Sequence, residues 1–358
     1  MGAGSGQGGR GGDREGRRGR SVTLSDVRGA RAAIMGVADG TPLVPSPFLS
    51  GVAGAEVLLK LESMQPMGAF KLRGALNAIR ALPGGAPGVV CCSTGNHGRA
   101  VAWAARAQGL RAVVCLSTLV PEAKVSGIRA LGAELRIVGR SQDDAQEEAS
   151  RLSAAGGLVE IPPFDDPAVI AGQGTIALEL IEARPDLRTL LVPLSGGGLA
   201  AGIAVAVKAI DPSIRVIGLT MDRGAAMHAA LRAGRPVPVE EVASLADSLG
   251  GGIGLANRHT FALCRELLDE VVLVGEDEIY RGMQALYWED RLVAEGACAV
   301  GVAALLSGRL AGLAAPIATI VTGRNVDMGV FTRVVTGQDV TLGAHLVRGR
   351  AWDTTSAS

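Results

Sequence analysis

Residues 67–75 read Met67-Gly68-Ala69-Phe70-Lys71-Leu72-Arg73-Gly74-Ala75, and the rest of the chain is organised around them. A strand-like run at 55–62 precedes this segment, a Pro/Gly turn comes next, and a helical pattern begins at Phe70. Lys71 is therefore predicted in the first turn of a helix. A lysine amine becomes a covalent catalyst when burial, a neighbouring cation such as Arg73, or a helix N-terminus lowers its pKa. The segment makes Lys71 the candidate catalytic residue, against the alternative of a solvated lysine at a helix start.

The composition is typical of a globular protein with a sizeable core. The chain has 358 residues, of which 48% are hydrophobic. Lys+Arg and Asp+Glu are both 35, and aromatic residues make up 3%, so neither nucleic acid nor an anionic membrane is indicated as a partner. Five cysteines without a C-x-x-C spacing argue against a disulfide framework or a zinc site. With no signal-peptide core and no membrane-spanning apolar run, we expect a cytoplasmic protein.

Alternating strands and helices predict an α/β fold with two parallel-sheet domains. Residues 1–20 are rich in Gly and Arg and are predicted to be a disordered tail. The Pro/Gly-rich segment 83–88 is interpreted as a crossing between domains. The large domain is predicted to contain 21–82 and 161–340, the small domain 83–160, and a C-terminal tail 341–358.

Three loops follow predicted strands, where ligands of open parallel sheets bind. Strand 89–92 leads into Ser93-Thr94-Gly95-Asn96-His97-Gly98, strand 189–194 into Ser195-Gly196-Gly197-Gly198-Leu199, and strand 317–321 into Thr322-Gly323-Arg324-Asn325. The glycine loop opens a helix, so its N–H groups can converge on a phosphate. From this loop alone, a monophosphate site, a dinucleotide site with Asp222 as the ribose ligand, and a plain turn remain open.

The loop at 93–98 is rich in hydrogen-bond donors and suits a carboxylate or a heteroaromatic oxygen. Alone, this signal is weak, because a single histidine such as His97 is more often structural than a base or a metal ligand. The other histidines, His228, His259 and His345, have no partner at metal-ligand spacing.

A lysine, a donor-rich loop, a glycine loop and a hydroxyl-bearing strand end occur here in the order that a pyridoxal phosphate site needs. The chain resembles the fold type II pyridoxal-phosphate enzymes, and within them the serine/threonine dehydratase and serine racemase family, over about residues 25 to 335. The resemblance implies a tryptophan synthase β-like architecture, with the cofactor between two α/β domains, and a homodimer. The segments that carry it are 60–62, 65–75, 95–98, 167–175, the glycine loop and 276–279.

The resemblance also implies a role for each candidate residue. Lys71 would bind the cofactor as a Schiff base and act as general acid and base, with Phe70 beside it. A neutral Thr322 hydroxyl at the pyridine nitrogen would leave the ring uncharged, which favours prompt loss of a β-substituent. Asn96 would bond the ring oxygen, and Ser195, Gly196, Gly197, Gly198 and Leu199 the phosphate. Ser93, Thr94, Asn96 and His97 would hold the substrate carboxylate.

The departures from the family pattern concern the substrate more than the cofactor. Arg99 replaces a Gln, Arg324 replaces a Gly, and both are predicted to contact the substrate. With the segment 323–328, these residues make the chain look most like the hydroxyectoine-utilisation branch. Ala69 stands in place of a Ser, and Ser195 in place of a Gly. Thr220 and Ala226 occupy acidic positions of the family's metal site, so no metal is expected.

The sequence thus predicts a pyridoxal-phosphate lyase of amino-acid catabolism. It would remove a β-hydroxyl as water from threonine, serine or a hydroxyectoine-derived substrate, giving a 2-oxo acid and ammonia from the first two. Three alternatives remain open. They are a racemase that uses Thr94 as the opposite-face base, a nicotinamide-dependent oxidoreductase that uses the glycine loop and Asp222, and a non-catalytic cofactor carrier or partner subunit.

Overall fold

The computed structural model describes residues 21–93, 95–118, 120, 122–140, 142–310 and 312–353, without the side chains of 122–124, 142, 143 and 156. The predicted tail 1–20 and the candidate residue Thr94 lie outside the described residues. In the described part, the strands form a six-stranded sheet, a four-stranded sheet and a short hairpin. None of the described helices is long and apolar enough to cross a membrane.

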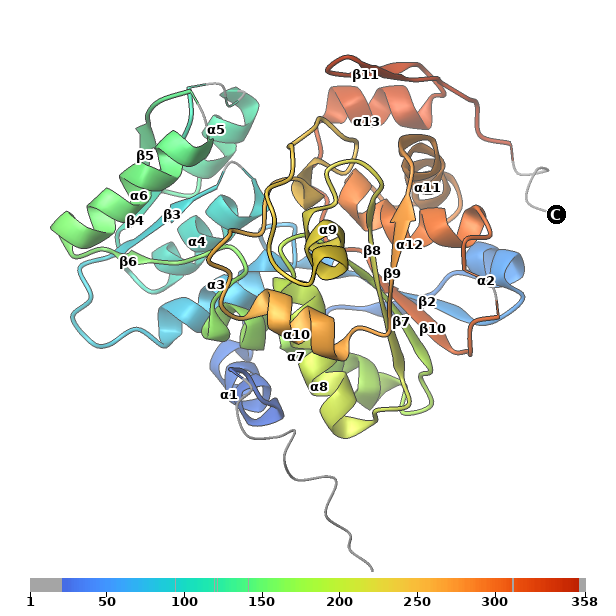
Figure 1. The fold of residues 1–358 in the computed structure, drawn as a ribbon, viewed down its shortest axis with the longest axis horizontal. Helices are drawn as coiled ribbons and strands as arrows, with labels where there is room; N and C mark the ends of the chain where they lie inside the picture. The colour runs from blue at the N-terminus through green and yellow to red at the C-terminus, as the bar shows by residue number, and fades with distance from the viewer. Residues whose placement is uncertain are drawn as a thin grey trace, which may run out of the picture.

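The six-stranded sheet has the order β1-β2-β10-β7-β8-β9 and is parallel except for its β1 edge. Its inner strands are buried and, apart from residues such as Lys60, mostly apolar, as expected when helices cover both faces. Helix α8 (Gly198–Ile210), with α7 (Pro167–Ala183), covers one face, and α12 (Gly296–Leu306), with α11 (Glu276–Trp288), covers the other (Figure 1). The strands are β1 Leu43–Pro45, β2 Val57–Lys60, β7 Thr189–Pro193, β8 Arg215–Met221, β9 Glu270–Val274 and β10 Ile317–Ile320.

The four-stranded sheet is fully parallel, with the order β5-β4-β3-β6. Its strands are β3 Val89–Cys92, β4 Ala112–Leu116, β5 Glu134–Ile137 and β6 Val159–Glu160. Helix α4 (Asn96–Ala107) packs on one face and α6 (Gln142–Gly156) on the other. The predicted α/β fold is therefore confirmed, with strands and helices alternating around two parallel sheets. The remaining helices are α1 Leu24–Ile34, α2 Pro47–Ala53, α5 Glu122–Arg129, α9 Ala226–Ala233, α10 Thr260–Leu267 and α13 Met328–Val335, with short 3-10 turns η1 Glu62–Met64 and η2 Asp247–Leu249.

Helix α3 (Lys71–Arg80) lies between the two sheets, because it packs against α7 on one side and α4 on the other. Glycines permit the close approach to α7. A Cβ on Gly74 would lie 2.8 Å from the Val169 carbonyl oxygen, and a Cβ on Gly172 would lie 2.6 Å from the Arg73 carbonyl oxygen. The predicted Lys71 helix therefore exists, and its first residue stands where the two parts of the molecule meet.

The chain beyond residue 340 is not a simple tail, so the prediction for 341–358 is wrong over the part that the structure describes. Strands β11 (Val340–Leu342) and β12 (His345–Val347) form an antiparallel hairpin. Val347 is fully buried, and the ring of Trp352 lies 5.8 Å from that of Phe48 in an edge-on contact. Two three-residue strands are too short to give a clear alternating pattern, so the hairpin depends on the core that it covers.

Candidate functional site

Lys71 occupies the first position of α3, and its amine points to the segment that follows β6. Nζ donates to the Pro163 carbonyl oxygen at 2.6 Å and lies 5.4 Å from the centre of the Phe70 ring. Burial lowers the pKa of Lys71 to about 8, while the negative charge of Glu295 acts in the opposite direction. The amine is therefore neutral far more often than an ordinary lysine near neutral pH, as a nucleophile needs to be.

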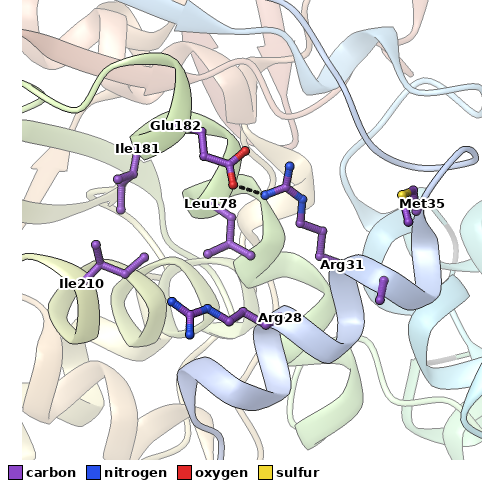
Figure 2. A pocket seen from close by; sticks show the side chains of 8 residues that line it. Arg28, Arg31, Met35, Leu178, Ile181, Glu182 and Ile210 are labelled. Atoms are coloured by element: carbon purple, nitrogen blue, oxygen red, sulfur yellow. Dashed lines mark hydrogen bonds and ion pairs between the residues drawn. The ribbon is translucent and has the colours of Figure 1, made fainter.

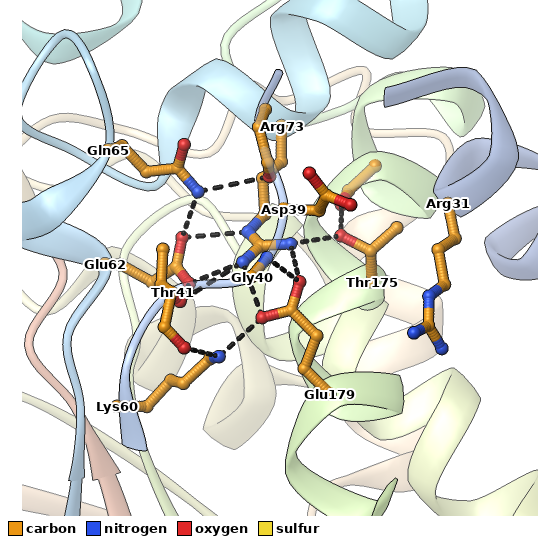
Figure 3. A network of polar contacts seen from close by, with 12 residues as sticks. Arg31, Asp39, Gly40, Thr41, Lys60, Glu62, Gln65, Arg73, Thr175 and Glu179 are labelled. Atoms are coloured by element: carbon orange, nitrogen blue, oxygen red, sulfur yellow. Dashed lines mark hydrogen bonds and ion pairs between the residues drawn. The ribbon is translucent and has the colours of Figure 1, made fainter. Parts of the chain in front are cut away.

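Arg73 does not lower the pKa of Lys71, contrary to the sequence-based expectation. Its guanidinium is fully buried in a separate polar network (Figure 3). It donates to both carboxylate oxygens of Glu62 at 2.8 Å and to those of Glu179 at 2.6 and 3.0 Å. Lys60 joins the network through Glu179, so two positive charges balance two negative ones. This network holds the start of α3 against η1 and α7 and fixes Lys71 through the backbone rather than by charge.

Asn96, at the start of α4, is buried and has partners from distant segments. Its Nδ2 donates to the two carboxylate oxygens of Glu295 at 2.8 and 3.0 Å, and its Oδ1 accepts from Asn325 Nδ2 at 2.7 Å. Asn325 Nδ2 also donates to the Met67 carbonyl oxygen at 3.0 Å. These bonds bring together the ends of β3 and β10, the loop before α3 and the start of α12.

His97 is buried, and its ring makes one hydrogen bond in the described part of the chain. Nε2 lies 2.7 Å from the Ile161 carbonyl oxygen, which can only accept, so Nε2 carries the hydrogen and Nδ1 does not. Burial and the charge of Lys71 lower the pKa of His97 to about 3, against the effect of the Ile161 bond. The ring therefore has no donor left for a substrate carboxylate. His97 can therefore contact a substrate carboxylate only through its backbone N–H at the start of α4.

The described residues on either side of Thr94 suit an anion-binding loop before α4. Ser93 Oγ accepts from the Gly95 N–H at 3.3 Å, and a Cβ on Gly98 would lie 2.6 Å from the Ser93 carbonyl oxygen. The first N–H groups of a helix have no carbonyl one turn earlier, so those of α4 point into this loop.

The two arginines that depart from the family pattern have different surroundings. Arg99 is half-buried, and within the described residues its guanidinium has neither a hydrogen bond nor an ion pair. Burial lowers the pKa of Arg99, and the charge of Glu295 acts against this. Arg324 is exposed, donates to the Gly68 carbonyl oxygen through its backbone N–H at 2.9 Å, and reaches Met64 Sδ at 3.8 Å.

The glycine loop lies at the N-terminus of α8, as predicted. Gly197 has a φ of +91°, which favours glycine, and a Cβ there would lie 2.7 Å from Met227 Cε. A Cβ on Gly196 would lie 2.3 Å from the Phe164 ring, and one on Gly198 3.0 Å from Phe164 Cα. The loop thus packs closely against Phe164 and Met227, which leave little room for side chains at these three positions. Phe164 follows the carbonyl bound by Lys71, so the loop and the lysine flank residues 163–164.

Thr322, at the end of β10, is buried beside the Lys71 segment. Its carbonyl oxygen accepts from the Phe70 N–H at 2.9 Å, and the next residue, Gly323, pairs with Ala69 in an isolated bridge. Its Oγ1 lies 3.2 Å from Cys298 Sγ. Burial raises the pKa of Cys298 to about 12, so the thiol stays protonated.

Sequence reasoning missed two kinds of residue at this site. Glu295 was not singled out, although it is a lone acidic residue in the small and apolar run 294–299. The segment 163–164 gave no signal of its own, because it acts through a backbone carbonyl and through packing.

A cavity of about 430 Å³ lies elsewhere, between α1, α7 and α8 (Figure 2). Apolar side chains such as Ile210 and Met35 line it, with Arg28 at its edge and Arg31 paired to Glu182. It contains none of the predicted site residues.

Comparison with known proteins identifies the class of ligand. Residues 34–323 match the model of the family described as pyridoxal-phosphate dependent enzyme. A protein of Sinorhizobium fredii, whose name provisionally assigns it as a threonine dehydratase, is 55% identical over 88% of this chain and 96% of its own. The L-threonine ammonia-lyase of Thermotoga maritima is 39% identical over 88% of this chain and 78% of its own length. The structure of maize serine racemase superposes with a TM-score of 0.83 at 32% sequence identity. The superposition covers 87% of this chain and 96% of the racemase chain.

The observed residues fit pyridoxal phosphate. A phosphate needs converging N–H groups that no side chain obstructs, and the glycine loop at the start of α8 provides them. An aldehyde needs an amine that is neutral near physiological pH, and Lys71 has a pKa of about 8. Lys71 contacts Pro163 and the glycine loop contacts Phe164, so the two groups lie near each other.

Proposed function

The chain belongs to the pyridoxal-phosphate dependent enzymes of fold type II, in the serine/threonine dehydratase family, and from this premise we propose that it eliminates water from a β-hydroxy amino acid. With threonine or serine, loss of the α-proton and the β-hydroxyl gives an enamine that hydrolyses to a 2-oxo acid and ammonia. The observation that carries the proposal is the position of the Lys71 amine, which binds the Pro163 carbonyl oxygen next to Phe164, the residue that packs on the glycine loop.

Each candidate residue has a separate proposed role in this reaction. Bound pyridoxal phosphate supplies the electron sink that makes an α-proton removable. Lys71 would carry the cofactor, with Phe70 packed beside it, and would afterwards move the proton at the substrate α-carbon. Asn96 would donate to the ring oxygen, and the neutral Thr322 hydroxyl would serve the ring nitrogen. The N–H groups of Ser195, Gly196, Gly197, Gly198 and Leu199 would bind the phosphate.

The substrate is held by the start of α4. Backbone N–H groups of the loop, together with the Ser93 hydroxyl, bind its carboxylate. Because the His97 ring has no spare donor, His97 contributes through its backbone. Thr94, which lies outside the described residues, takes part in the same contact.

The substrate that fits the two unusual arginines carries a second anionic group, as a hydroxyectoine-derived amino acid can. The half-buried Arg99 guanidinium is available for a charge-assisted contact, which supports this choice. Arg324, whose exposed side chain reaches Met64, is the second proposed contact.

Racemisation is the second candidate, and the similarity to maize serine racemase favours it. It requires a base on the face opposite Lys71, and Thr94 is the proposed group. The family resemblance further supports a cytoplasmic homodimer, divided into a large domain of 21–82 and 161–340 and a small domain of 83–160.

Borohydride reduction followed by mass spectrometry of the digested protein tests the cofactor assignment. The reduced adduct should map to Lys71, and Lys71→Ala should abolish both the adduct and the visible absorbance band. The chain has three other lysines, Lys60, Lys124 and Lys208, and an adduct on any of these would contradict the proposal. A substrate screen for release of 2-oxo acid and ammonia, with chiral analysis of unreacted substrate, separates elimination from racemisation.

A further inference from the structure

A series of hydrogen bonds links four segments of the protein and ends on the buried carboxylate of Glu295. Asn325 Nδ2 donates to the Met67 carbonyl oxygen at 3.0 Å and to Asn96 Oδ1 at 2.7 Å. Asn96 Nδ2 donates to Glu295 at 2.8 and 3.0 Å. Asn96 is 8% exposed and Glu295 4%, so water competes little for these bonds.

A backbone group fixes the direction of this series. The Met67 carbonyl can only accept, so the Asn325 atom that faces it is the amide nitrogen. That nitrogen gives its other hydrogen to Asn96, so the Asn96 atom facing Asn325 is the oxygen. Nδ2 of Asn96 must then face Glu295, whose carboxylate can only accept. If the Asn96 amide were flipped, its nitrogen would face the Asn325 nitrogen, two donors together, and its oxygen would face the Glu295 carboxylate, two acceptors together.

This arrangement leaves one hydrogen of Asn96 for a ligand. Seen from Nδ2, the two oxygens of a carboxylate lie close together, whereas the two amide hydrogens point well apart. One hydrogen therefore serves both oxygens of Glu295, and the other remains available.

Two features of the fold hold the Glu295 carboxylate in place: the N-terminus of α12, which favours a negative charge, and the absence of a side chain at Gly323 beside it. It is the N-cap residue of α12, an end of the helix that favours an anion. A Cβ on Gly323 would lie 2.7 Å from Glu295 Oε1, so a side chain there would displace the carboxylate. The charge of Glu295 also raises the pKa of Lys71 against the effect of burial.

We propose that Glu295 is a positioning residue for the cofactor: it holds the Asn96 amide with one hydrogen free for the ring oxygen, and its negative charge also acts on the Lys71 amine, with which it forms no ion pair. The inference rests on the proposed function, because that function assigns Asn96 and Lys71 to pyridoxal phosphate. Glu295 itself does not touch the reacting atoms.

Glu295→Gln tests both parts in the apoprotein. Glutamine has nearly the same size but no charge, and it can turn a donor toward Asn96. The affinity for pyridoxal phosphate should fall about tenfold to a hundredfold, as for a lost hydrogen bond to a charged group. The pKa of Lys71, followed by NMR of ¹³C-methylated protein, should fall, and with four lysines in the chain the spectrum is simple to assign. Glu276→Gln is the matched control, since Glu276 is equally buried in the first turn of α11, and neither quantity should change.

Two further variants separate positioning from charge. Glu295→Asp keeps the charge but shortens the reach, so the affinity should fall while the pKa of Lys71 stays close to the wild-type value. Asn325→Ala removes the bond that orients Asn96 and leaves the charge in place, with the same expected result. Asn325→Ala also supplies the answer if Glu295→Gln does not fold.

Wild-type affinity in folded Glu295→Gln and in Asn325→Ala would overturn the proposal, and so would an unchanged pKa of Lys71 in Glu295→Gln. Failure of the proposed function is a separate result. It would appear as a covalently bound cofactor in Lys71→Ala, whereas the NMR titration of Lys71 is made without cofactor.

Discussion

The amine of Lys71 lies 2.6 Å from the carbonyl oxygen of Pro163, and within the described residues it forms no ion pair with a carboxylate. Burial without a close counter-ion favours the neutral amine and lowers the pKa of Lys71 to about 8. Since the neutral amine attacks the aldehyde, the rate at which the apoprotein binds pyridoxal phosphate covalently should rise with pH around a midpoint of about 8. Stopped-flow absorbance measures this rate. A midpoint near 10.5, the ordinary value for lysine, would contradict the buried position.

Arg73→Met should lower the free energy of unfolding by about 3–5 kcal/mol, because it leaves Glu62 and Glu179 buried with one cation, Lys60, between them. In the wild type, burial alone would raise the pKa of Glu179, but Arg73 and Lys60 lower it to about 2. Urea titration followed by circular dichroism provides the measurement.

The matched control for Arg73 is Arg184→Met, which breaks more exposed ion pairs with Glu56 and Asp186. Such a pair contributes up to about 1 kcal/mol. Equal losses in the two variants would mean that the Arg73 network stabilises the fold no more than a surface ion pair does.

Local patterns predicted the elements of the fold and the ends of strands where the site lies. The apolar run 89–92 became a buried parallel strand, and the turn at Pro66 and Gly68 placed Lys71 at a helix start. The glycine loop was located for the same reason, since N–H groups at a helix start are a local property.

The partners of these residues could not be predicted, because they are distant in the sequence. Asn96 and Glu295 are 199 residues apart, and Arg73 and Glu179 are 106 apart. No periodicity relates them, and the packing of α3 between α4 and α7 decides which charges meet. Arg73 was accordingly expected beside the Lys71 amine but faces the opposite side of the helix start.

His97 should make the stability of the protein depend on acid pH. In the folded protein its pKa is lowered from 6.5 to about 3, first by burial and then by the charge of Lys71. Between these values the unfolded chain binds a proton that the folded chain does not, so stability present above pH 6.5 is lost as the pH falls toward 3. The loss has an upper limit of roughly 5 kcal/mol. Urea titrations from pH 7 to pH 4 should show a shallower dependence for His97→Gln, and equal slopes would refute the prediction.

Magnesium is predicted not to activate this protein, because the sequence resemblance puts Thr220 and Ala226 where the family is expected to have acidic metal ligands. In the described residues no group of three or more His, Cys, Asp or Glu is placed to hold a metal ion. Asp222 and Asp247 are the remaining candidates. Activity with magnesium and with EDTA should be equal, and activation that disappears in Asp222→Ala or Asp247→Ala would refute the prediction.

Arg99 should select the substrate without stabilising the fold. Its guanidinium is half-buried without a partner among the described residues, so Arg99→Gln should leave the melting temperature unchanged. If the guanidinium binds a second anionic group, this change should lower kcat/KM about tenfold to a hundredfold for a hydroxyectoine-derived substrate and leave threonine turnover intact. The double variant Arg99→Gln with Arg324→Gly should lower kcat/KM for the hydroxyectoine-derived substrate further and still leave threonine turnover intact.

The alternative is that both arginines serve the structure, and the same variants distinguish it. A structural role predicts a lower melting temperature and an equal loss of activity toward both substrates. Arg99→Lys sharpens the comparison, since lysine keeps the charge but cannot make a bidentate contact. If kcat/KM in Arg99→Lys is higher than in Arg99→Gln, the contact depends on charge. If the two variants have equal kcat/KM, the contact is bidentate. The substrate assignment itself fails if the wild-type protein turns over threonine faster than any substrate with a second anionic group.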